Sequence, residues 1–135
     1  MFLMSKRRSP RIMIVDSNIL SILVAEKLLV RSGFEVHKMS STNGILPRIN
    51  YVKPDLLLID YQIPRLGGDV FLESIKKLPR FSRMIIVLYT DQEANVLREL
   101  CVKHDFHGYF TKSMDINDLP EFLGRFFKKP EGAAT

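Results

Sequence analysis

The sequence predicts a single α/β domain in which a parallel sheet is covered by helices on both faces. Short apolar runs alternate along the chain with segments whose apolar residues recur at about the helical period. With 135 residues, of which 46% are hydrophobic, the chain can close one core without disulfides. It is about half as long as a (β/α)8 barrel. We therefore expect an open, doubly wound sheet with five strands and five helices.

The first half of the chain contains three of these strands and two of these helices. Strands are expected at the short apolar or β-branched runs, 11–15, 34–38 and 56–59. The last of them has four consecutive apolar residues, as in strands covered on both faces. Helices are expected at 18–32 and 42–52. Gly33 is suited to end the first helix, whereas Pro47 interrupts the second. The apolar residues of the first helix lie close to the helical period: Ile19, Ile22, Leu23, Leu28 and Leu29.

The second half continues the alternation. Strands are expected at 84–88 and 108–110, and helices at 70–78, 91–104 and 115–127. Asp91 is the expected N-cap of the fourth helix, because its carboxylate can accept the free amide hydrogens of the first turn. Phe122, Phe126 and Phe127 have helical spacing and predict the core-facing side of the last helix.

Charge predicts a basic lead-in. The 20 Lys and Arg exceed the 15 Asp and Glu, which gives a net charge of +5. Four of the basic residues lie near the N-terminus: Lys6, Arg7, Arg8 and Arg11. Such a cluster can attract nucleic acid, but no zinc-finger spacing accompanies it, so we favour a solvated segment and expect no nucleic-acid partner. The expected organisation is a lead-in at 1–10, a domain at 11–128 and a flexible tail at 129–135.

Cysteine usage and hydropathy predict the compartment. The single Cys101 cannot form an internal disulfide, so the chain gives no sign of an oxidising compartment. No apolar stretch approaches the ~18 residues of a membrane span. In the first residues the charges follow a very short apolar piece, which is the reverse of a secretory signal. We therefore expect a cytoplasmic protein with no membrane contact.

Four polar side chains lie at the ends of the predicted strands. Asp60 follows the run Leu56–Ile59 and opens a loop that contains proline and glycine, while Asp16, Thr90 and Lys112 end three other strands. The carboxyl ends of parallel strands meet at one edge of the sheet, where open α/β proteins bind their ligands. Carboxylates suit a hard divalent cation, and a hydroxyl with an ammonium suits phosphoryl oxygens. The sequence thus predicts phosphoryl transfer to Asp60.

These residues and their neighbours resemble the receiver domain of two-component response regulators. The matching segments are Ile12 to Asp16, Asp60 to Pro64 with Gly68, Tyr89 to Thr90, and Gly108 to Lys112. They follow the family's order and spacing over residues 11–128, as in single-domain receivers of the chemotaxis type. The resemblance implies a flavodoxin-like strand order, 2-1-3-4-5.

The resemblance also implies a role in a phosphorelay. Asp60 would accept a phosphoryl group from a sensor histidine kinase, and Thr90 and Lys112 would hold the transferred group. Mg²⁺ would be bound by Asp16, by Asp60 and by the main-chain carbonyl of Gln62. The protein would catalyse only its own phosphorylation and would not otherwise be an enzyme.

Signalling in the family depends on a local switch. Thr90 and Tyr109 would rearrange on phosphorylation, and the surface of the fourth helix, fifth strand and fifth helix would then contact a downstream protein. For Tyr109, ordinary packing of a half-buried tyrosine is the alternative. Receivers occur as monomers and as dimers through the fourth-helix face, so a homodimer is one expected state.

Three residues depart from the family pattern. Ser17 stands where receivers usually have a second acid, which would leave a serine hydroxyl or water as a weaker Mg²⁺ ligand. Asp91 replaces a small residue, and its charge near the site could oppose phosphorylation. Ser113 replaces a proline whose preceding peptide bond is commonly cis, so we expect the Lys112–Ser113 bond to be trans.

Two interpretations remain open. The chain is either a phosphorylatable receiver or a pseudo-receiver that binds partners without phosphorylation, and Ser17 is the residue that separates them. An aspartyl phosphatase is disfavoured because position 62 carries Gln instead of a second acid, and a nucleotide-binding protein because no glycine follows the first strand. The three histidines lack metal-ligand spacing and are assigned to packing or the surface: His37, His104 and His107.

Overall fold

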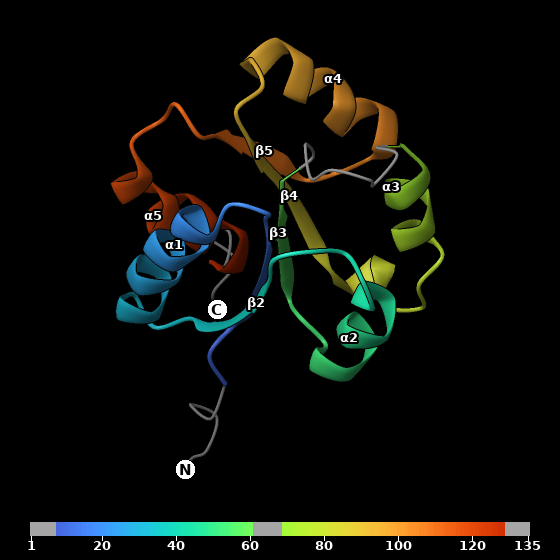
Figure 1. The fold of residues 1–135 in the computed structure, drawn as a ribbon, viewed down its shortest axis with the longest axis horizontal. Helices are drawn as coiled ribbons and strands as arrows, with labels where there is room; N and C mark the ends of the chain where they lie inside the picture. The colour runs from blue at the N-terminus through green and yellow to red at the C-terminus, as the bar shows by residue number, and fades with distance from the viewer. Residues whose placement is uncertain (1–7, 61–68, 129–135) are drawn as a thin grey trace, which may run out of the picture.

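The computed structural model describes residues 8–60 and 69–128 of the chain. Its strands form one five-stranded parallel sheet in the order β2-β1-β3-β4-β5. The strands are β1 Arg11–Val15, β2 Glu35–Met39, β3 Leu56–Ile59, β4 Ile85–Thr90 and β5 Gly108–Thr111. The α-helices are α1 Ile19–Arg31, α2 Ile45–Val52, α3 Asp69–Lys76, α4 Ala94–His104 and α5 Leu119–Gly124. The predicted doubly wound fold and its strand order are confirmed (Figure 1).

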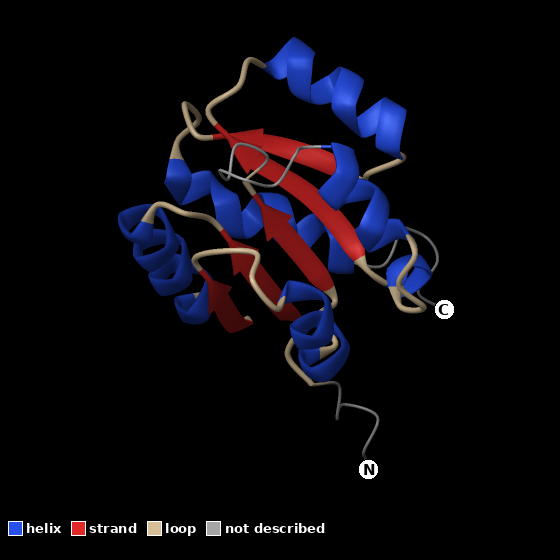
Figure 2. Ribbon diagram, turned by 45° about the vertical axis from the view of Figure 1, so that its right-hand side comes forward, coloured by secondary structure: helices blue, strands red, loops and turns tan. Residues whose placement is uncertain are grey.

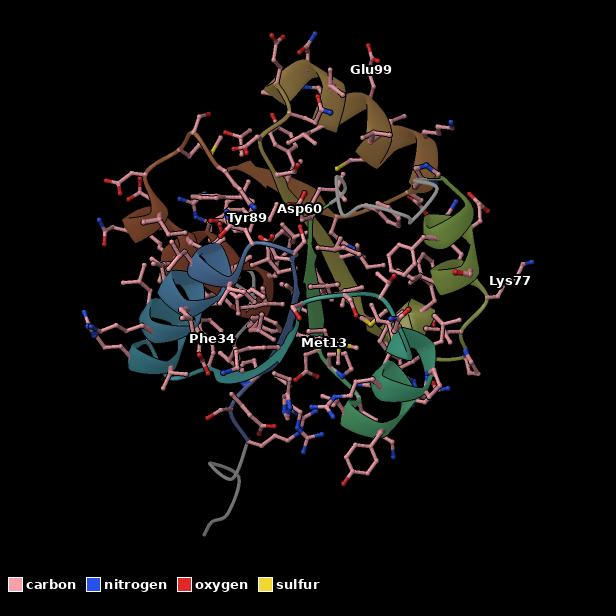
Figure 3. The ribbon with its side chains drawn as sticks, viewed as in Figure 1. Met13, Phe34, Asp60, Lys77, Tyr89 and Glu99 are labelled. Atoms are coloured by element: carbon pink, nitrogen blue, oxygen red, sulfur yellow. The ribbon has the colours of Figure 1, made fainter. Side chains whose placement is uncertain are left out.

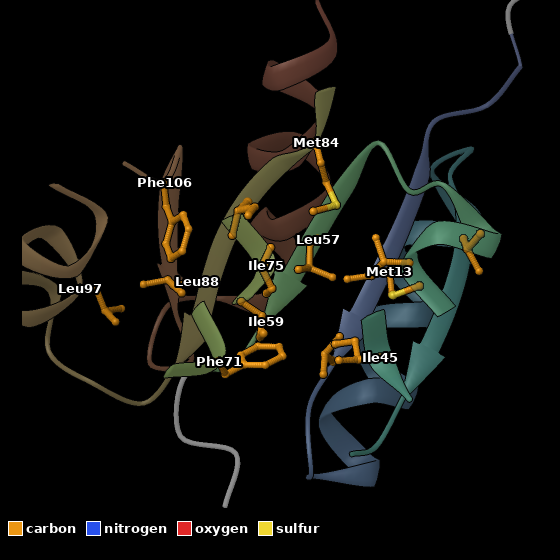
Figure 4. Close-up of a cluster of buried hydrophobic side chains, with 14 residues drawn as sticks. Met13, Ile45, Leu57, Ile59, Phe71, Ile75, Met84, Leu88, Leu97 and Phe106 are labelled. Atoms are coloured by element: carbon orange, nitrogen blue, oxygen red, sulfur yellow. The ribbon is translucent and has the colours of Figure 1, made fainter. Parts of the chain in front are cut away.

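Two apolar cores lie on the opposite faces of the sheet, because successive strand residues point to opposite sides. On β1, Met13 and Val15 join the core under α2, α3 and α4, whereas Ile12 and Ile14 join the core under α1 and α5. The two helical layers are seen on either side of the strands in Figures 1 and 2, and Figure 4 shows the core beneath α2, α3 and α4. Every residue of β3 is buried, which explains its uninterrupted apolar sequence.

Helix α1 begins and ends as its sequence predicts. The Asn18 side chain accepts a hydrogen bond from the Ser21 amide at 3.1 Å, which satisfies one free donor of the first turn. At the other end Gly33 has φ +97, in the left-handed region that glycine adopts without strain. Both ends of the helix are therefore set by local sequence.

Two predicted helix starts are wrong. Helix α2 begins at Ile45 instead of residue 42, so Pro47 is its third residue. The amides of the first turn have no intrahelical acceptor, and proline loses nothing there. Helix α4 begins at Ala94 with Glu93 as its N-cap, so Asp91 is not the cap; β4 extends to Thr90, and Asp91 lies in the turn that follows it.

Two helices bury only part of their apolar residues. On α1 the buried residues are Ile22, Ala25 and Leu29, while Ile19 and Leu23 are exposed. The predicted last helix is α5 flanked by two short 3-10 turns, η3 Ile116–Asp118 and η4 Arg125–Phe127. Its fully buried side chains are Leu119 and Leu123. The predicted aromatic residues Phe122, Phe126 and Phe127 are half-buried at the margin of that core.

Two further expectations concern the Lys112–Ser113 peptide bond and helices that could span a membrane. No peptide bond in the described part of the chain is cis, so the Lys112–Ser113 bond is trans, as predicted. Across residues 8–60 and 69–128, none of the helices is both long and apolar enough to span a membrane.

Candidate functional site

The parallel register brings the predicted site residues to one edge of the sheet. Val15 pairs with Ile59, so the next residues, Asp16 and Asp60, lie at the same level on adjacent strands. The Asp60 amide donates to Val15 O at 2.9 Å, and the Lys112 amide donates to Thr90 O at 2.8 Å. These main-chain hydrogen bonds continue the sheet pairing into the site. They therefore hold the backbone of Asp60 and Lys112, from which the side chains of the site extend. Figure 3 shows Asp60 at this end of β3.

Lys112 joins the two carboxylates. Its Nζ lies 2.8 Å from Asp16 Oδ2 and 3.1 Å from Asp60 Oδ2. Asp16 is completely buried and Asp60 is 7% exposed. Asp16 Oδ2 makes no well-aligned hydrogen bond within the described residues, so its contact with Lys112 is chiefly ionic. Two negative side chains at the ends of different strands thus share one positive charge that is largely shielded from water.

The environment raises the pKa values of both Asp16 and Lys112. Burial raises the pKa of Asp16, and the nearby Lys112 ammonium and the Asn18 amide only partly offset it. For Lys112, burial opposes the charged form, but the two carboxylates outweigh it and raise the pKa of the ammonium. Lys112 is therefore positively charged at neutral pH.

Thr90 and Tyr109 occupy the neighbouring strands. Thr90 ends β4, is fully buried and pairs with Thr111 of β5. Tyr109 is half-buried and packs against the core under α4, on the opposite side of β5 from the buried Phe110. The structure thus places Tyr109 on the strand that leads into Lys112, next to α4.

Ser17 and Asp91 lie outside this buried cluster, and the expectation for Gln62 concerns a residue that the structure does not describe. The Ser17 and Asp91 side chains are exposed. No group of three or more His, Cys, Asp or Glu side chains able to hold a metal occurs within residues 8–60 and 69–128. Asp16 and Asp60 still present hard oxygen ligands at adjacent strand ends, and Asp16 Oδ2 is buried with the Lys112 ammonium as its ionic partner. These two residues fit Mg²⁺ if waters complete its shell, since Mg²⁺ usually retains several.

The histidines are structural, as the sequence analysis assigned them. His104 is buried and its Nδ1 lies 3.2 Å from Glu73 Oε2, which links α4 to α3. His107 Nδ1 accepts a hydrogen bond from the Ile86 amide at 3.1 Å. His37 Nε2 lies 2.6 Å from Glu35 Oε2 on β2.

Two contributors to the site escaped the sequence analysis. The Asn18 amide donates to Asp16 Oδ1 at 2.9 Å, which orients that carboxylate; the Asp-x-Asn spacing is a local signal for such a turn. In the sequence Tyr89 is only the residue before Thr90, yet its ring centroid lies 5.3 Å from Lys112 Nζ. No local pattern predicts that contact, because Tyr89 lies on β4 whereas Lys112 follows the end of β5.

Comparison with known proteins identifies the family. A family model for the response regulator receiver domain matches residues 12–123. The chain therefore belongs to the response regulator receiver domain family, whose members act in two-component signalling.

The relatives and the solved structures agree with this assignment. The DNA-binding transcriptional activator EvgA of Escherichia coli K12 is 24% identical over 107 residues, which are 78% of this chain and 52% of EvgA. A protein-glutamate methylesterase/protein-glutamine glutaminase of Methanospirillum hungatei is 22% identical over 93% of this chain and 37% of that protein. The chain thus spans about half the length of EvgA, and less of the methylesterase.

Among solved structures, chemotaxis protein CheY4 of Vibrio cholerae has a TM-score of 0.77 at 17% identity, covering 87% of this chain and 98% of CheY4. A CheY-like receiver domain protein of Methanospirillum hungatei has a TM-score of 0.75 at 23% identity, covering 87% and 93% of the two chains. At these identities the likeness establishes the fold.

Proposed function

We propose that this chain is a phosphorylatable receiver in which Asp60 accepts a phosphoryl group from a histidine kinase. The observation that carries the proposal is the Lys112 ammonium, 3.1 Å from Asp60 Oδ2 at the carboxyl edge of a parallel sheet. Thr90 ends the strand between Asp60 and Lys112 in the sheet order. A nucleophile, a fixed cation and a hydroxyl therefore lie on three neighbouring strands.

In the proposed reaction an Asp60 carboxylate oxygen attacks the phosphorus of a phosphohistidine. A P–O bond forms, the P–N bond breaks, and the imidazole leaves with the bonding electron pair and takes up a proton, giving an acyl phosphate. Lys112, already beside Asp60, and the Thr90 hydroxyl, once it has moved toward the phosphoryl group, hold the transferred oxygens, so the new charge gains two donors. When bound by Asp16, Asp60 and the main-chain carbonyl of Gln62, Mg²⁺ would offset the repulsion between donor and nucleophile. Ser17 or a water would fill the position of the missing second acid.

Acetyl phosphate provides a direct test. Incubation with acetyl phosphate and MgCl2 should add the mass of one phosphoryl group to the intact protein, and Asp60→Asn should remove that adduct. Omission of Mg²⁺ should strongly reduce it. If saturating Mg²⁺ gives no adduct, and a cognate kinase gives none either, the alternative stands: a pseudo-receiver that binds partners without phosphorylation, as the exposed Ser17 would suggest.

The kinase is proposed to approach along α1. This helix begins three residues after Asp16, and five of its large apolar side chains are exposed: Ile19, Leu20, Leu23, Val24 and Val30. A donor that reaches Asp60 must lie near the first turn of α1, because Asp16 and Asp60 end adjacent strands. An apolar helix surface beside the nucleophile suits a protein donor, and a small phosphodonor would not need it.

The output is proposed to pass through α4, β5 and α5. Thr90 and Tyr109 lie on the two strands that lead into this region, so movement of Thr90 toward a phosphoryl group would repack Tyr109 beside α4. Val102 on α4 is 79% exposed and offers an apolar contact for a downstream protein or a second copy of the chain. We propose a cytoplasmic signalling module without nucleic-acid contacts or further enzymatic activity.

A further inference from the structure

The Tyr89 ring forms one wall of the site around Lys112. Its centroid lies 5.3 Å from Lys112 Nζ, and the residue is only 5% exposed. A cation at this distance from an aromatic ring is attracted to its π electrons, and the attraction strengthens where water is excluded. Lys112 Nζ therefore contacts two carboxylates, on the ends of β1 and β3, and an aromatic ring on β4.

The position of this ring is set by other aromatic side chains. Tyr89 belongs to the core under α1 and α5, on the opposite face of β4 from Leu88, and Figure 3 shows it on that side of Asp60. The Tyr89 and Phe110 centroids are 6.1 Å apart, and Phe110 lies 5.4 Å from Phe122 of α5. The aromatic contacts from β4 to α5 limit the freedom of the Tyr89 ring to turn away from Lys112.

We infer that Tyr89 is a positioning residue that holds the Lys112 ammonium beside Asp60 through the face of its ring. The inference rests on the proposed function, in which Lys112 binds the transferred phosphoryl group. A lysine side chain has four flexible carbons and can place its ammonium in many positions. A ring fixed beneath it reduces those positions and leaves the charge where phosphoryl oxygens would arrive.

If Tyr89 only filled the core and did not position Lys112, a different set of side chains would be tolerated at position 89. The preceding residues of β4 are aliphatic, so a core role alone requires only an apolar side chain, which a leucine supplies at the cost of the volume that the ring fills. A positioning role requires the π face but not the hydroxyl. Tyr89→Phe should therefore preserve the positioning of the ammonium, while Tyr89→Leu should weaken it.

Two measurements on the full chain test the inference. In protein labelled with ¹³C-lysine, the Lys112 ε-CH2 resonance, assigned by its loss in Lys112→Arg, should show an upfield ring-current shift. The shift should persist in Tyr89→Phe and disappear in Tyr89→Leu. The initial rate of Asp60 phosphorylation by acetyl phosphate at fixed Mg²⁺ should fall about fivefold in Tyr89→Leu and less than about twofold in Tyr89→Phe.

Tyr51 supplies a matched control, because it is 84% exposed on α2. Tyr51→Leu should change neither measurement. Thermal unfolding of each variant shows whether it is folded, and the Lys112 resonance is read only from folded protein. An unshifted Lys112 resonance in the wild type, or one that is unchanged in Tyr89→Leu, overturns the inference. Equal loss in Tyr89→Phe and Tyr89→Leu also overturns it, because the hydroxyl would then be the active group.

The two measurements also separate this inference from the proposed function. If wild-type protein takes no phosphoryl group from acetyl phosphate or from a cognate histidine kinase, the proposed function fails. The resonance of Lys112 still tests whether Tyr89 holds the ammonium in place. If the wild type is phosphorylated and Tyr89→Leu reacts at the same rate, the proposed function stands and the positioning role is overturned.

Discussion

Lys112 balances the charge of the candidate site. Asp16 and Asp60 bring two carboxylates to adjacent strand ends, and the Lys112 ammonium lies within 3.1 Å of an oxygen of each. Burial weakens screening by water, so the repulsion between the acids and their attraction to the cation are both larger than on the surface. The raised pKa of Lys112, which the two carboxylates produce against the effect of burial, keeps this charge in place at neutral pH.

Replacing Lys112 with methionine should therefore destabilise the protein. Lys112→Met leaves two buried carboxylates without their cation, and the free energy of unfolding should fall by about 3 kcal/mol. Lys38→Met is the matched control, because Lys38 forms an exposed ion pair with Glu26 and should contribute less than about 1 kcal/mol. Urea denaturation at pH 7 measures both. A loss in Lys112→Met no larger than in the control would show that Lys112 is not needed to balance the charge.

At the scale of elements, the helix ends show which local sequence signals are enough to predict where a helix begins. Asn18 caps α1 through a side chain that reaches the first turn of the helix, at the residue where the sequence predicts that the helix begins. Asp91 has the chemistry of a cap but not the position, since pairing with β5 extends β4 to Thr90. A cap can be read from sequence only where no tertiary contact moves the end of the neighbouring strand.

The exposed surface of α1 leads to a prediction about the kinase. Leu20 is 73% exposed, so Leu20→Glu should not disturb the core. We expect at least a tenfold slower phosphotransfer from the kinase, because a charge would enter an apolar contact, and an unchanged rate with acetyl phosphate. Val102→Glu on α4 is the control and should leave both rates unchanged. Equal effects of the two variants, or slowing with acetyl phosphate as well, would argue against docking on α1.

On the scale of the whole molecule, Asp55 connects three segments at the end of the sheet opposite the candidate site. Arg8 Nη1 and Nη2 lie 2.8 and 3.1 Å from the two carboxylate oxygens of Asp55, just before β3. The same carboxylate accepts the Arg11 amide at 2.8 Å and lies 3.9 Å from Arg80 Nη2. Segments before β1, before β3 and after α3 thus meet at one side chain. Residues 8–10 of the expected lead-in therefore have a contact with the domain, while its boundary at residue 10 stays a prediction.

This cluster predicts how stability depends on pH. Burial opposes ionisation of Asp55, but Arg8 and the Arg11 amide prevail and lower its pKa. The folded protein then binds this proton less readily than the unfolded chain, so the stabilisation is complete above about pH 4 and is lost as pH falls through the lowered pKa. Asp55→Asn should lower the free energy of unfolding by about 1–2 kcal/mol at pH 7. The difference in this free energy between wild type and Asp55→Asn should become smaller toward pH 3.

Comparison of variants isolates this effect from that of Asp16, whose raised pKa acts in the opposite direction. Urea midpoints of wild type and Asp55→Asn should be measured from pH 3 to pH 7. Asp105→Asn is a suitable control, because Asp105 is exposed and asparagine tolerates its left-handed backbone with φ +61. A constant gap between wild type and Asp55→Asn across this range would contradict the assignment.

The sequence by itself determined the order of strands and helices, the buried β3 and the four residues expected at the sheet edge. Apolar periodicity and turn residues act over a few neighbours, so they can be read locally. The family resemblance added the strand order and the roles proposed for Asp16, Asp60, Thr90 and Lys112. Their proximity follows from a parallel register, which is a general property of the fold.

Only the tertiary structure decided which groups surround Lys112. Its contacts with Asp16, Asp60 and Tyr89 join four strands that are distant in sequence. The same holds for the exposed apolar side of α1, because α5 and the sheet cover only the opposite side. Such contacts depend on side-chain packing across the sheet, and no pattern within one segment carries that information.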